Sequence, residues 1–309
     1  MRGVFERRSL READFARMFS ITRERFAYKP ADRDRLAALW RELFHEESCI
    51  TVAIEDHRRP AAQRVVGFGM TVFTTDDFAK RLLAGAPLLS RGFLEQWEAG
   101  VRPYLKPTEI AKANATTGVN IAVLHYGWCS EVAPEDMGTI QLMQTENYVH
   151  RHAGYRTQQY LHEVYGPMLR DFVLATGSQL RHDYRDPKWA TGLAGVSEDD
   201  WPHLTGYGTD AASPPGSWVS MVRAKEQPVR FRFSPGEQDL LSLALDGASD
   251  QEIAEALELS LWTVKKRWQR VYAKVGAVDA RLLPHDGQRR RHLVGYLREH
   301  PSELRPFRE

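Results

Sequence analysis

Apolar and polar positions in the N-terminal part of the chain follow two spacings, one typical of helices and one typical of strands. Helical spacing recurs at 33–44, 78–89, 92–97, 137–152 and 156–174, whereas 49–54, 65–73 and 119–126 have the apolar character of strands. The polar segment 55–64 predicts a hairpin loop between the first two strands. Helices and strands in this order predict an α+β domain.

Two runs of turn-forming residues predict where this domain ends. Residues 210–217 are rich in Ala, Ser, Pro and Gly, and Gln227-Pro228 is a second break just before Phe231. We therefore divide the chain into an α+β domain at 1–228, a small helical domain at 229–285 and a helical extension at 286–309.

The small domain opens with helix caps that the sequence spells out. Ser234-Pro-Gly-Glu237 and Ser249-Asp-Gln-Glu252 each place a Glu three positions after a Ser, which is the pattern of a capping box. Ser260 caps a third helix, which we expect to run through Lys274 and to end at Gly276. Three capped helices in succession predict an all-α domain.

The third helix has one apolar face and one cationic face. Val264, Trp268, Val271 and Val275 are spaced four, three and four apart and form a single stripe. Basic side chains lie off this stripe or at its flank: Lys265, Lys266, Arg267, Arg270 and Lys274. A capped pair of helices with a basic outer face is typical of a helix-turn-helix, whose second helix lies in the major groove of DNA.

The charge along the chain supports this interpretation. The whole sequence carries a net charge of only +1. Residues 234–260 hold seven acidic and no basic side chains, whereas 261–309 hold twelve Lys or Arg and five Asp or Glu. A polyanion would therefore meet only this last part of the chain favourably.

The stretch from Gly247 to Ala277 resembles the LuxR/GerE-type domain of bacterial transcription regulators. The family's G-x-S-x-x-E-I-A run, its L-x-x-S, its T-V-K and its Y-x-K-hydrophobic-G ending all occur here. The resemblance implies that Thr263 and Lys265 contact DNA. Arg267 stands where His is usual, and Glu258 stands where Gly is common, so that turn must either avoid positive φ or tolerate strain.

The C-terminal segment 288–300 also has helical spacing, with Leu293, Tyr296 and Leu297 after a run of three arginines. Three roles are open to it: docking on the helical domain, pairing two chains, or holding phosphate.

The large N-terminal domain resembles the GNAT acyltransferase fold in the order of its elements. It holds no acidic receiver cluster and no GxxxxGK[ST] loop. Arg151-His-Ala-Gly-Tyr-Arg156 is similar to the family's [Q/R]-x-x-G-x-[G/A] turn, although Arg156 occupies the last small position. The resemblance implies a turn that opens a helix and holds the pyrophosphate of acyl coenzyme A on its backbone amides.

Aromatic and polar residues predict a small-molecule pocket in the same domain. The candidates are Trp97, Tyr126, Trp128, Arg151, Gly154, Tyr155 and Arg156. No general base stands out, so we expect a sensor of acyl coenzyme A or another effector rather than an enzyme. The histidines lack the spacing of a zinc helix, and Cys49 and Cys129 fit buried free thiols.

These observations predict a cytoplasmic transcription regulator, with no apolar run that could span a membrane and no signal peptide. Its fold would be an α+β sensor domain followed by an all-α helix-turn-helix domain. Its partners would be double-stranded DNA, a small-molecule effector, a second copy of the chain and RNA polymerase. One alternative is a GNAT-like acyltransferase with a helix-turn-helix targeting domain, and another is an interaction module with a decayed DNA domain.

Overall fold

The computed structural model divides the chain into two compact units. The first comprises Met1–Arg151 and Arg156–Val222, and the second His152–Tyr155 and Arg223–Glu309. The structure describes residues 4–22, 30–85, 88–185, 196–208, 217–223, 229–284 and 287–305. The turn-forming run 210–216 and the predicted boundary at Pro228 lie outside these described residues.

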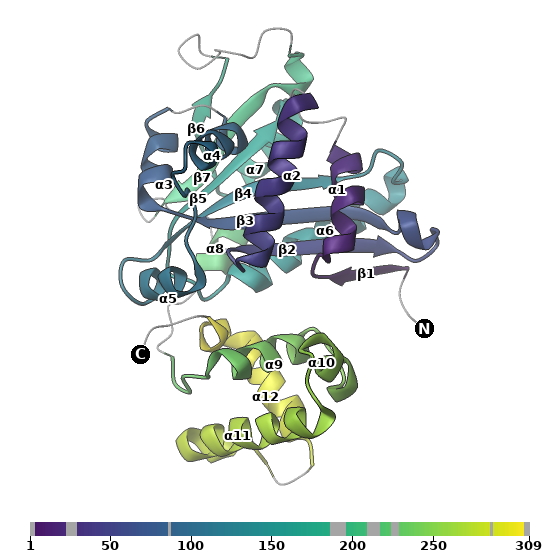
Figure 1. The fold of residues 1–309 in the computed structure, drawn as a ribbon, viewed down its shortest axis with the longest axis vertical. Helices are drawn as coiled ribbons and strands as arrows, with labels where there is room; N and C mark the ends of the chain where they lie inside the picture. Colours follow the sequence, from purple (N-terminus) through teal and green to yellow (C-terminus); the bar gives the residue numbers. More distant parts are fainter. Residues whose placement is uncertain are drawn as a thin grey trace. The chain divides into compact units, whose positions relative to one another are not determined.

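A mixed seven-stranded sheet forms the centre of the first unit (Figure 1). Its strands are β1 (Phe5–Arg8), β2 (Cys49–Asp56), β3 (Val65–Thr74), β4 (Val119–Trp128), β5 (Thr157–Tyr165), β6 (Gln179–Asp183) and β7 (Pro202–Gly208). They lie in the order β1-β2-β3-β4-β5-β7-β6. The pair β4 and β5 is parallel, while the other neighbours are antiparallel. The predicted hairpin of β2 and β3 is confirmed.

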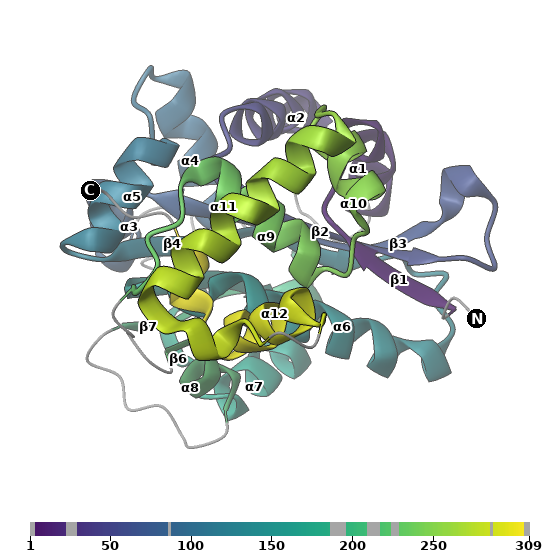
Figure 2. The same cartoon turned by 90° about the horizontal axis from the view of Figure 1, so that it is seen from below.

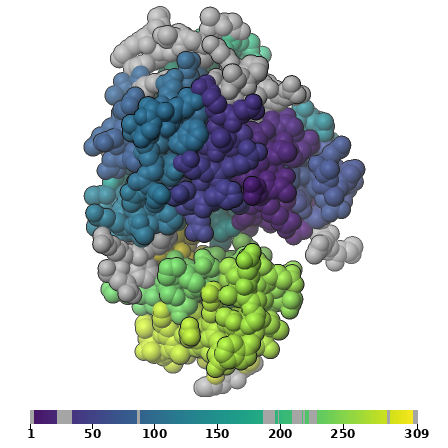
Figure 3. Space-filling model, in the orientation of Figure 1, coloured from purple at the N-terminus to yellow at the C-terminus, as the bar shows by residue number. Residues whose placement is uncertain are grey.

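Helices cover both faces of this sheet. They are α1 (Phe15–Thr22), α2 (Pro30–His45), α3 (Asp76–Leu83), α4 (Leu89–Glu98), α5 (Pro107–Ala115), α6 (Pro134–His152), α7 (Gly166–Ala175) and α8 (Trp218–Arg223). Figures 1 and 2 show α1 and α2 on one face of the strands and α6 and α7 on the other. In Figure 3 the side chains of α1, α2 and α4, coloured purple to blue, close the first of these faces.

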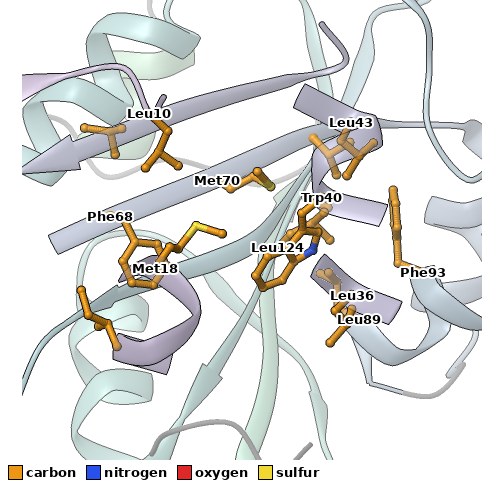
Figure 4. Packing of buried hydrophobic residues seen from close by; sticks show 14 of the residues in the cluster. Leu10, Met18, Leu36, Trp40, Leu43, Phe68, Met70, Leu89, Phe93 and Leu124 are labelled. Atoms are coloured by element: carbon orange, nitrogen blue, oxygen red, sulfur yellow. The ribbon is translucent and has the colours of Figure 1, made fainter. Parts of the chain in front are cut away.

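The main hydrophobic core lies between this helical layer and β2–β4. All ten residues of β3 are buried, because helices cover both of its faces. Trp40 of α2 is the largest of the fully buried side chains in the described residues: it is 2% exposed, and its ring lies 4.9 Å from that of Phe19. Figure 4 shows members of this core, namely Leu10, Met18, Leu36, Trp40, Leu43, Phe68, Met70, Leu89, Phe93 and Leu124.

The predicted helix at 156–174 is wrong over its first half. That half is strand β5, and only Gly166–Ala175 is helical, as α7. Gly166 has a φ of +76° and Pro167 follows it, so the chain turns sharply there. The first half pairs with β4 and β7 on either side, and this pairing outweighs its helical spacing.

The described part of the second unit contains four α-helices after the first unit's α8, namely α9 (Pro235–Leu245), α10 (Asp250–Ala256), α11 (Leu261–Asp279) and α12 (Arg289–Glu299). Ser234 and Ser249 form the predicted capping boxes, and the Ser260 side chain caps α11. Glu258 takes a φ of +53°, so this turn tolerates positive φ without a glycine. The identification of these helices as a helix-turn-helix domain stays a prediction.

Two details of the second unit differ from or extend the sequence analysis. Helix α11 does not end at Gly276 but continues to Asp279, because a single glycine costs a helix only about 1 kcal/mol. Leu293 and Leu297 of α12 are fully buried in the hydrophobic cluster of this unit. The C-terminal segment therefore docks within its own unit. None of the described helices is long and apolar enough to cross a membrane.

Candidate functional site

The parallel strands β4 and β5 separate halfway along their length. They are paired from Val119 opposite Thr157 as far as Val123 opposite His162, and no pairing is found beyond. The register of β4 against β3 shifts at the same level, where Met70 faces His125 but Thr71 faces Val123. Leu124 is the extra residue of this bulge. Bulges often lie beside active sites, where they redirect a side chain.

A small pocket of about 30 Å³ lies where the two strands separate. Its lining comes from α4, β4, β5 and α7: Ser90, Val123, Leu124, His125, Tyr126, His162, Glu163, Tyr165 and Leu169. The Ser90 hydroxyl donates a hydrogen bond to the carbonyl oxygen of Leu124, at 3.2 Å. The pocket is therefore tied to the bulge by a polar contact.

Glu163 is the buried carboxylate of this pocket. The Tyr165 hydroxyl donates to Glu163 Oε1 at 2.5 Å, and the Leu89 backbone N–H donates to Oε2 at 2.6 Å. Leu89 is the first residue of α4, so the carboxylate lies at the positive end of that helix. Burial nevertheless raises the pKa of Glu163 to about 6, against the two hydrogen bonds, which lower it. This carboxylate changes its charge just below neutral pH.

Three other rings of the pocket, those of His125, Tyr126 and His162, stay neutral near pH 7. Burial lowers the pKa of His162 to about 4 and that of His125 well below its ordinary value. Burial also raises the pKa of Tyr126, whose ring meets that of His162 edge-on at 5.9 Å. Among these three rings and Glu163, the carboxylate is thus the one suited to exchange a proton at physiological pH.

Sequence reasoning missed Glu163 and Tyr165 because it assigned their segment to a helix. A usable signal was present: Glu163 is the one charged residue in the run 160–165, and Gly166-Pro167 follows it. A charged side chain inside a buried strand needs partners, and such positions are candidates for function.

The predicted aromatic ligand residues are only partly brought together. Tyr126 lines the pocket, and the ring of Trp128 meets it edge-on at 5.8 Å. Trp97 lies on α4, where its indole N–H donates to both carboxylate oxygens of Glu42, at 3.0 and 3.1 Å.

The predicted anion-binding turn at Arg151–Arg156 does not open a helix. It follows the last turn of α6 and leads into β5. The guanidinium of Arg151 donates to Ser9 Oγ at 2.9 Å, and Arg156 donates from its backbone to Asn114 Oδ1 at 2.8 Å. Gly154 has a φ of +88°, and Tyr155 lies under the guanidinium of Arg305 within the second unit. A helix N-terminus is therefore not available at this turn.

The residues predicted to bind DNA lie on α11 in different surroundings. Lys265 and Arg270 are exposed, and the ammonium of Lys266 lies 5.3 Å from the Trp262 ring. Thr263 donates its backbone N–H to the Ser260 hydroxyl at 3.1 Å.

Two of the basic residues are bound within the unit. Arg267 donates to the Gly236 carbonyl at 3.1 Å, and Lys274 Nζ lies 2.7 Å from Glu237 Oε2. Part of the predicted cationic face therefore has an internal structural use.

Neither cysteine is in a disulfide, and burial raises the pKa of Cys49 to about 12. The described residues include no group of three or more His, Cys, Asp or Glu side chains placed to hold a metal ion.

Three solved structures represent what this chain is similar to. The C-terminal condensation domain of Ebony, in complex with beta-alanyl-dopamine, is 12% identical, and the match covers 66% of this chain and 98% of that one, with a TM-score of 0.41. NAA60 of Arabidopsis thaliana, with a bisubstrate analogue, is 10% identical, and the match covers 67% of this chain and 99% of that one, with a TM-score of 0.39. The spermidine N-acetyltransferase of Vibrio cholerae, with CoA and spermine, is 8% identical, and the match covers 70% of this chain and 98% of that one, with a TM-score of 0.38. No protein-family model matches the sequence, and a search of curated proteins finds no relative.

These similarities concern the fold of the sheet-bearing part of the chain. The mixed seven-stranded sheet with helices agrees with the α+β domain expected from the sequence, and the three matches cover 66% to 70% of this chain. They offer no support for a LuxR-type domain.

The prediction of a DNA-binding transcription regulator without enzymatic activity is wrong. Several of the similar structures are named acetyltransferases, and one is named an N-acyl amino acid synthase. Double-stranded DNA and RNA polymerase find no support as partners among them. The caps and the apolar stripe that motivated the prediction specify how helices pack, which does not by itself select a DNA-binding function.

Proposed function

We propose that the first unit is an acyltransferase that moves an acyl group from a thioester to an amine or a hydroxyl group. The observation that carries this proposal is the buried carboxylate of Glu163, which has a pKa of about 6 and lines the pocket where β4 and β5 separate. A general base works best when its pKa lies near the operating pH.

In this reaction Glu163 is the catalytic residue. The nucleophile attacks the acyl carbonyl carbon, a new C–N or C–O bond forms, and the C–S bond of the thioester breaks. The proton released by the nucleophile goes to the carboxylate of Glu163 and then to the departing sulfur, so the thiol leaves neutral. Mass and charge balance without any further reactant.

Tyr165 and Leu89 are positioning residues in this scheme. Each donates a hydrogen bond to one carboxylate oxygen, so together they fix the plane of the carboxylate. Both bonds favour the charged form, which keeps the pKa of Glu163 from rising further with burial. A carboxylate held in this way is ready to accept a proton without reorganising.

Acyl coenzyme A is the donor that the family resemblance implies, and coenzyme A is bound in the Vibrio cholerae structure. The turn that joins β4 to α6 follows a central strand and opens a long helix, which is the kind of position that an anion site uses. Its acidic side chains, Glu131, Glu135 and Asp136, do not fit the diphosphate of coenzyme A. The proposed chemistry uses only the thioester end of a donor.

The test is turnover by the full chain. The protein would be incubated with acyl thioesters and a panel of amines and alcohols. A chromogenic thiol reagent would measure thiol release, and mass spectrometry would identify the acylated product. Glu163→Gln keeps the shape of the side chain but removes the base, so we expect kcat to fall by a factor of about 10² to 10⁴. Glu95→Gln, an exposed position on α4, is the matched control and should leave kcat unchanged. Full activity in the Glu163→Gln variant would refute the assignment.

A further inference from the structure

The turn between β4 and α6 occupies the place in the sheet where a helix N-terminus meets the end of a central strand. Residues 129–133 connect Trp128 to Pro134, the first residue of α6. The amides and dipole of a long helix at such a position ordinarily favour an anion. The side chains around this turn are mainly acidic, however, and acidic side chains repel an anion.

Carboxylates outnumber guanidinium groups in the cavity of about 210 Å³ beside this turn. Its charged lining residues are Asp56, Arg58, Arg59, Glu131, Glu135 and Asp136. Four negative and two positive side chains give this lining a net charge of −2, and Arg17 Nη2 lies a further 3.8 Å from Glu131 Oε2. The hydrogen bond from Arg58 holds the pKa of Asp56 below its ordinary value, so that carboxylate is charged at neutral pH.

Both arginines are already bound to these carboxylates. Arg58 Nε lies 2.8 Å from Asp56 Oδ1, and its Nη2 lies 2.5 Å from Asp136 Oδ2. Arg59 Nη1 lies 3.0 Å from Glu131 Oε2, and its Nη2 donates to the Glu131 carbonyl at 2.8 Å. A phosphate could bind these guanidinium groups only by displacing the carboxylates.

Three backbone amides of the turn and of the start of α6 also have acceptors within the protein. The N–H of Cys129 donates to the Val66 carbonyl at 2.8 Å, and the N–H of Val132 donates to the Cys129 carbonyl at 3.2 Å. The N–H of Asp136 donates to the Ala133 carbonyl at 2.9 Å, and Pro134 has no N–H to offer. A cradle of free amides, which would hold a diphosphate, is therefore not built from these four positions.

We infer that the acyl donor is recognised through its pantetheine thioester and not through the nucleotide diphosphate of coenzyme A. This inference rests on the proposed acyl transfer and specifies its donor. Leu124, at the pocket, lies four residues before Trp128, or about 13 Å along β4. The distance from the reacting thioester to the acidic turn is thus roughly the length of an extended pantetheine arm. At that distance the carboxylates of the turn repel a diphosphate. A pantetheine arm carried by a small thiol or by a carrier protein meets no such penalty.

The test compares donors that share one acyl group and one acceptor. S-acetylpantetheine, acetyl-CoA and an acetylated carrier protein would be turned over by the full chain, with adenosine 3′,5′-diphosphate added as a competitor. We expect kcat/KM for acetyl-CoA to exceed that for S-acetylpantetheine by less than about tenfold, with no inhibition by the nucleotide. Higher kcat/KM with the carrier protein would identify the carrier as the source of the arm, and equal values would identify the small thioester.

A preference for acetyl-CoA above about tenfold, with inhibition by the nucleotide, would overturn the inference and leave the proposed function intact. Turnover of none of the three donors would overturn both. The charge argument has its own variant, Glu131→Gln with Glu135→Gln, which brings the cavity from −2 to 0. We expect this variant to raise the acetyl-CoA preference at least threefold, whereas the control Asp77→Asn with Glu95→Gln, both exposed elsewhere, leaves it unchanged. An unchanged preference in the first variant would contradict the role of the acidic turn.

Discussion

The hydroxyl of Tyr165 donates a hydrogen bond of 2.5 Å to the carboxylate of Glu163, two residues earlier on the same strand. Residues i and i+2 of a strand share one face, so β5 itself brings the two side chains together. The carboxylate is buried, yet its second oxygen accepts an amide hydrogen from Leu89 of α4. A strand end and a helix start thereby hold one titratable group between them.

Replacing Tyr165 by Phe should shift the pH dependence of the reaction. The hydrogen bond lowers the pKa of Glu163, so its loss lets burial raise that pKa further above 6. The acidic limb of kcat/KM against pH should therefore move to higher pH, and the plateau should fall less than in Glu163→Gln. A profile whose limb stays in place would show that Tyr165 does not act on the carboxylate. Circular dichroism of the variant checks that its fold is kept.

Burial of Glu163 should also make stability depend on pH. Its pKa is raised from 4.5 to about 6 in the folded state, so its contribution is full below pH 4.5 and is lost as pH rises through 6. A rise in this pKa from 4.5 to about 6 corresponds to roughly 2 kcal/mol of folding free energy. We therefore expect the free energy of unfolding of Glu163→Gln, relative to that of the wild type, to be higher at pH 8 than at pH 4. Urea unfolding of both proteins at the two pH values measures this difference.

His162 acts in the opposite direction, because its folded pKa is lowered to about 4. Its contribution is lost as pH falls from 6.5, but it is common to both proteins and cancels in the comparison. An equal difference between the two proteins at both pH values would contradict the buried-acid assignment.

Trp40 should be a main stability determinant of the first unit. It is almost fully buried, and its ring lies 4.1 Å from that of His125 and 4.9 Å from that of Phe19. Trp40→Ala should lower the free energy of unfolding by about 3–5 kcal/mol, since it removes this area and leaves a cavity. Met168→Ala on α7, where the side chain is 85% exposed, is the control and should change it by less than about 0.5 kcal/mol. Similar losses in both variants would refute the packing argument.

Lys274 should matter more for stability than Lys265, an exposed residue of the same helix α11. Burial opposes the charge of Glu237, but the hydrogen bond from Lys274 lowers the pKa of that carboxyl below its ordinary value. Lys274→Ala would leave the buried carboxylate without its charged partner, at a cost of about 1–3 kcal/mol. The exposed Lys265→Ala should cost less than about 0.5 kcal/mol. Thermal unfolding of the two variants decides, and equal midpoints would contradict the structural role.

Several elements could be predicted from local sequence because their signals are local. Ser234 and Ser249 cap helices with a Glu three residues later, and the structure contains both capping boxes. Strands β2, β3 and β4 begin at the predicted residues 49, 65 and 119, since runs of apolar residues bounded by polar turns admit few other arrangements.

The sequence by itself determined the helix caps, the apolar stripe of α11 and the central hairpin, because these depend on residues that are near neighbours in the chain. It did not determine that 157–165 is a strand, since that depends on pairing with β4 and β7, whose residues lie about 40 positions away on each side. Only the tertiary structure brought the amide of Leu89 to the carboxylate of Glu163, and Arg58 and Arg59 to the turn after β4. Burial and hydrogen bonding by distant residues set the pKa of a carboxylate, and neither can be read from its neighbours in sequence.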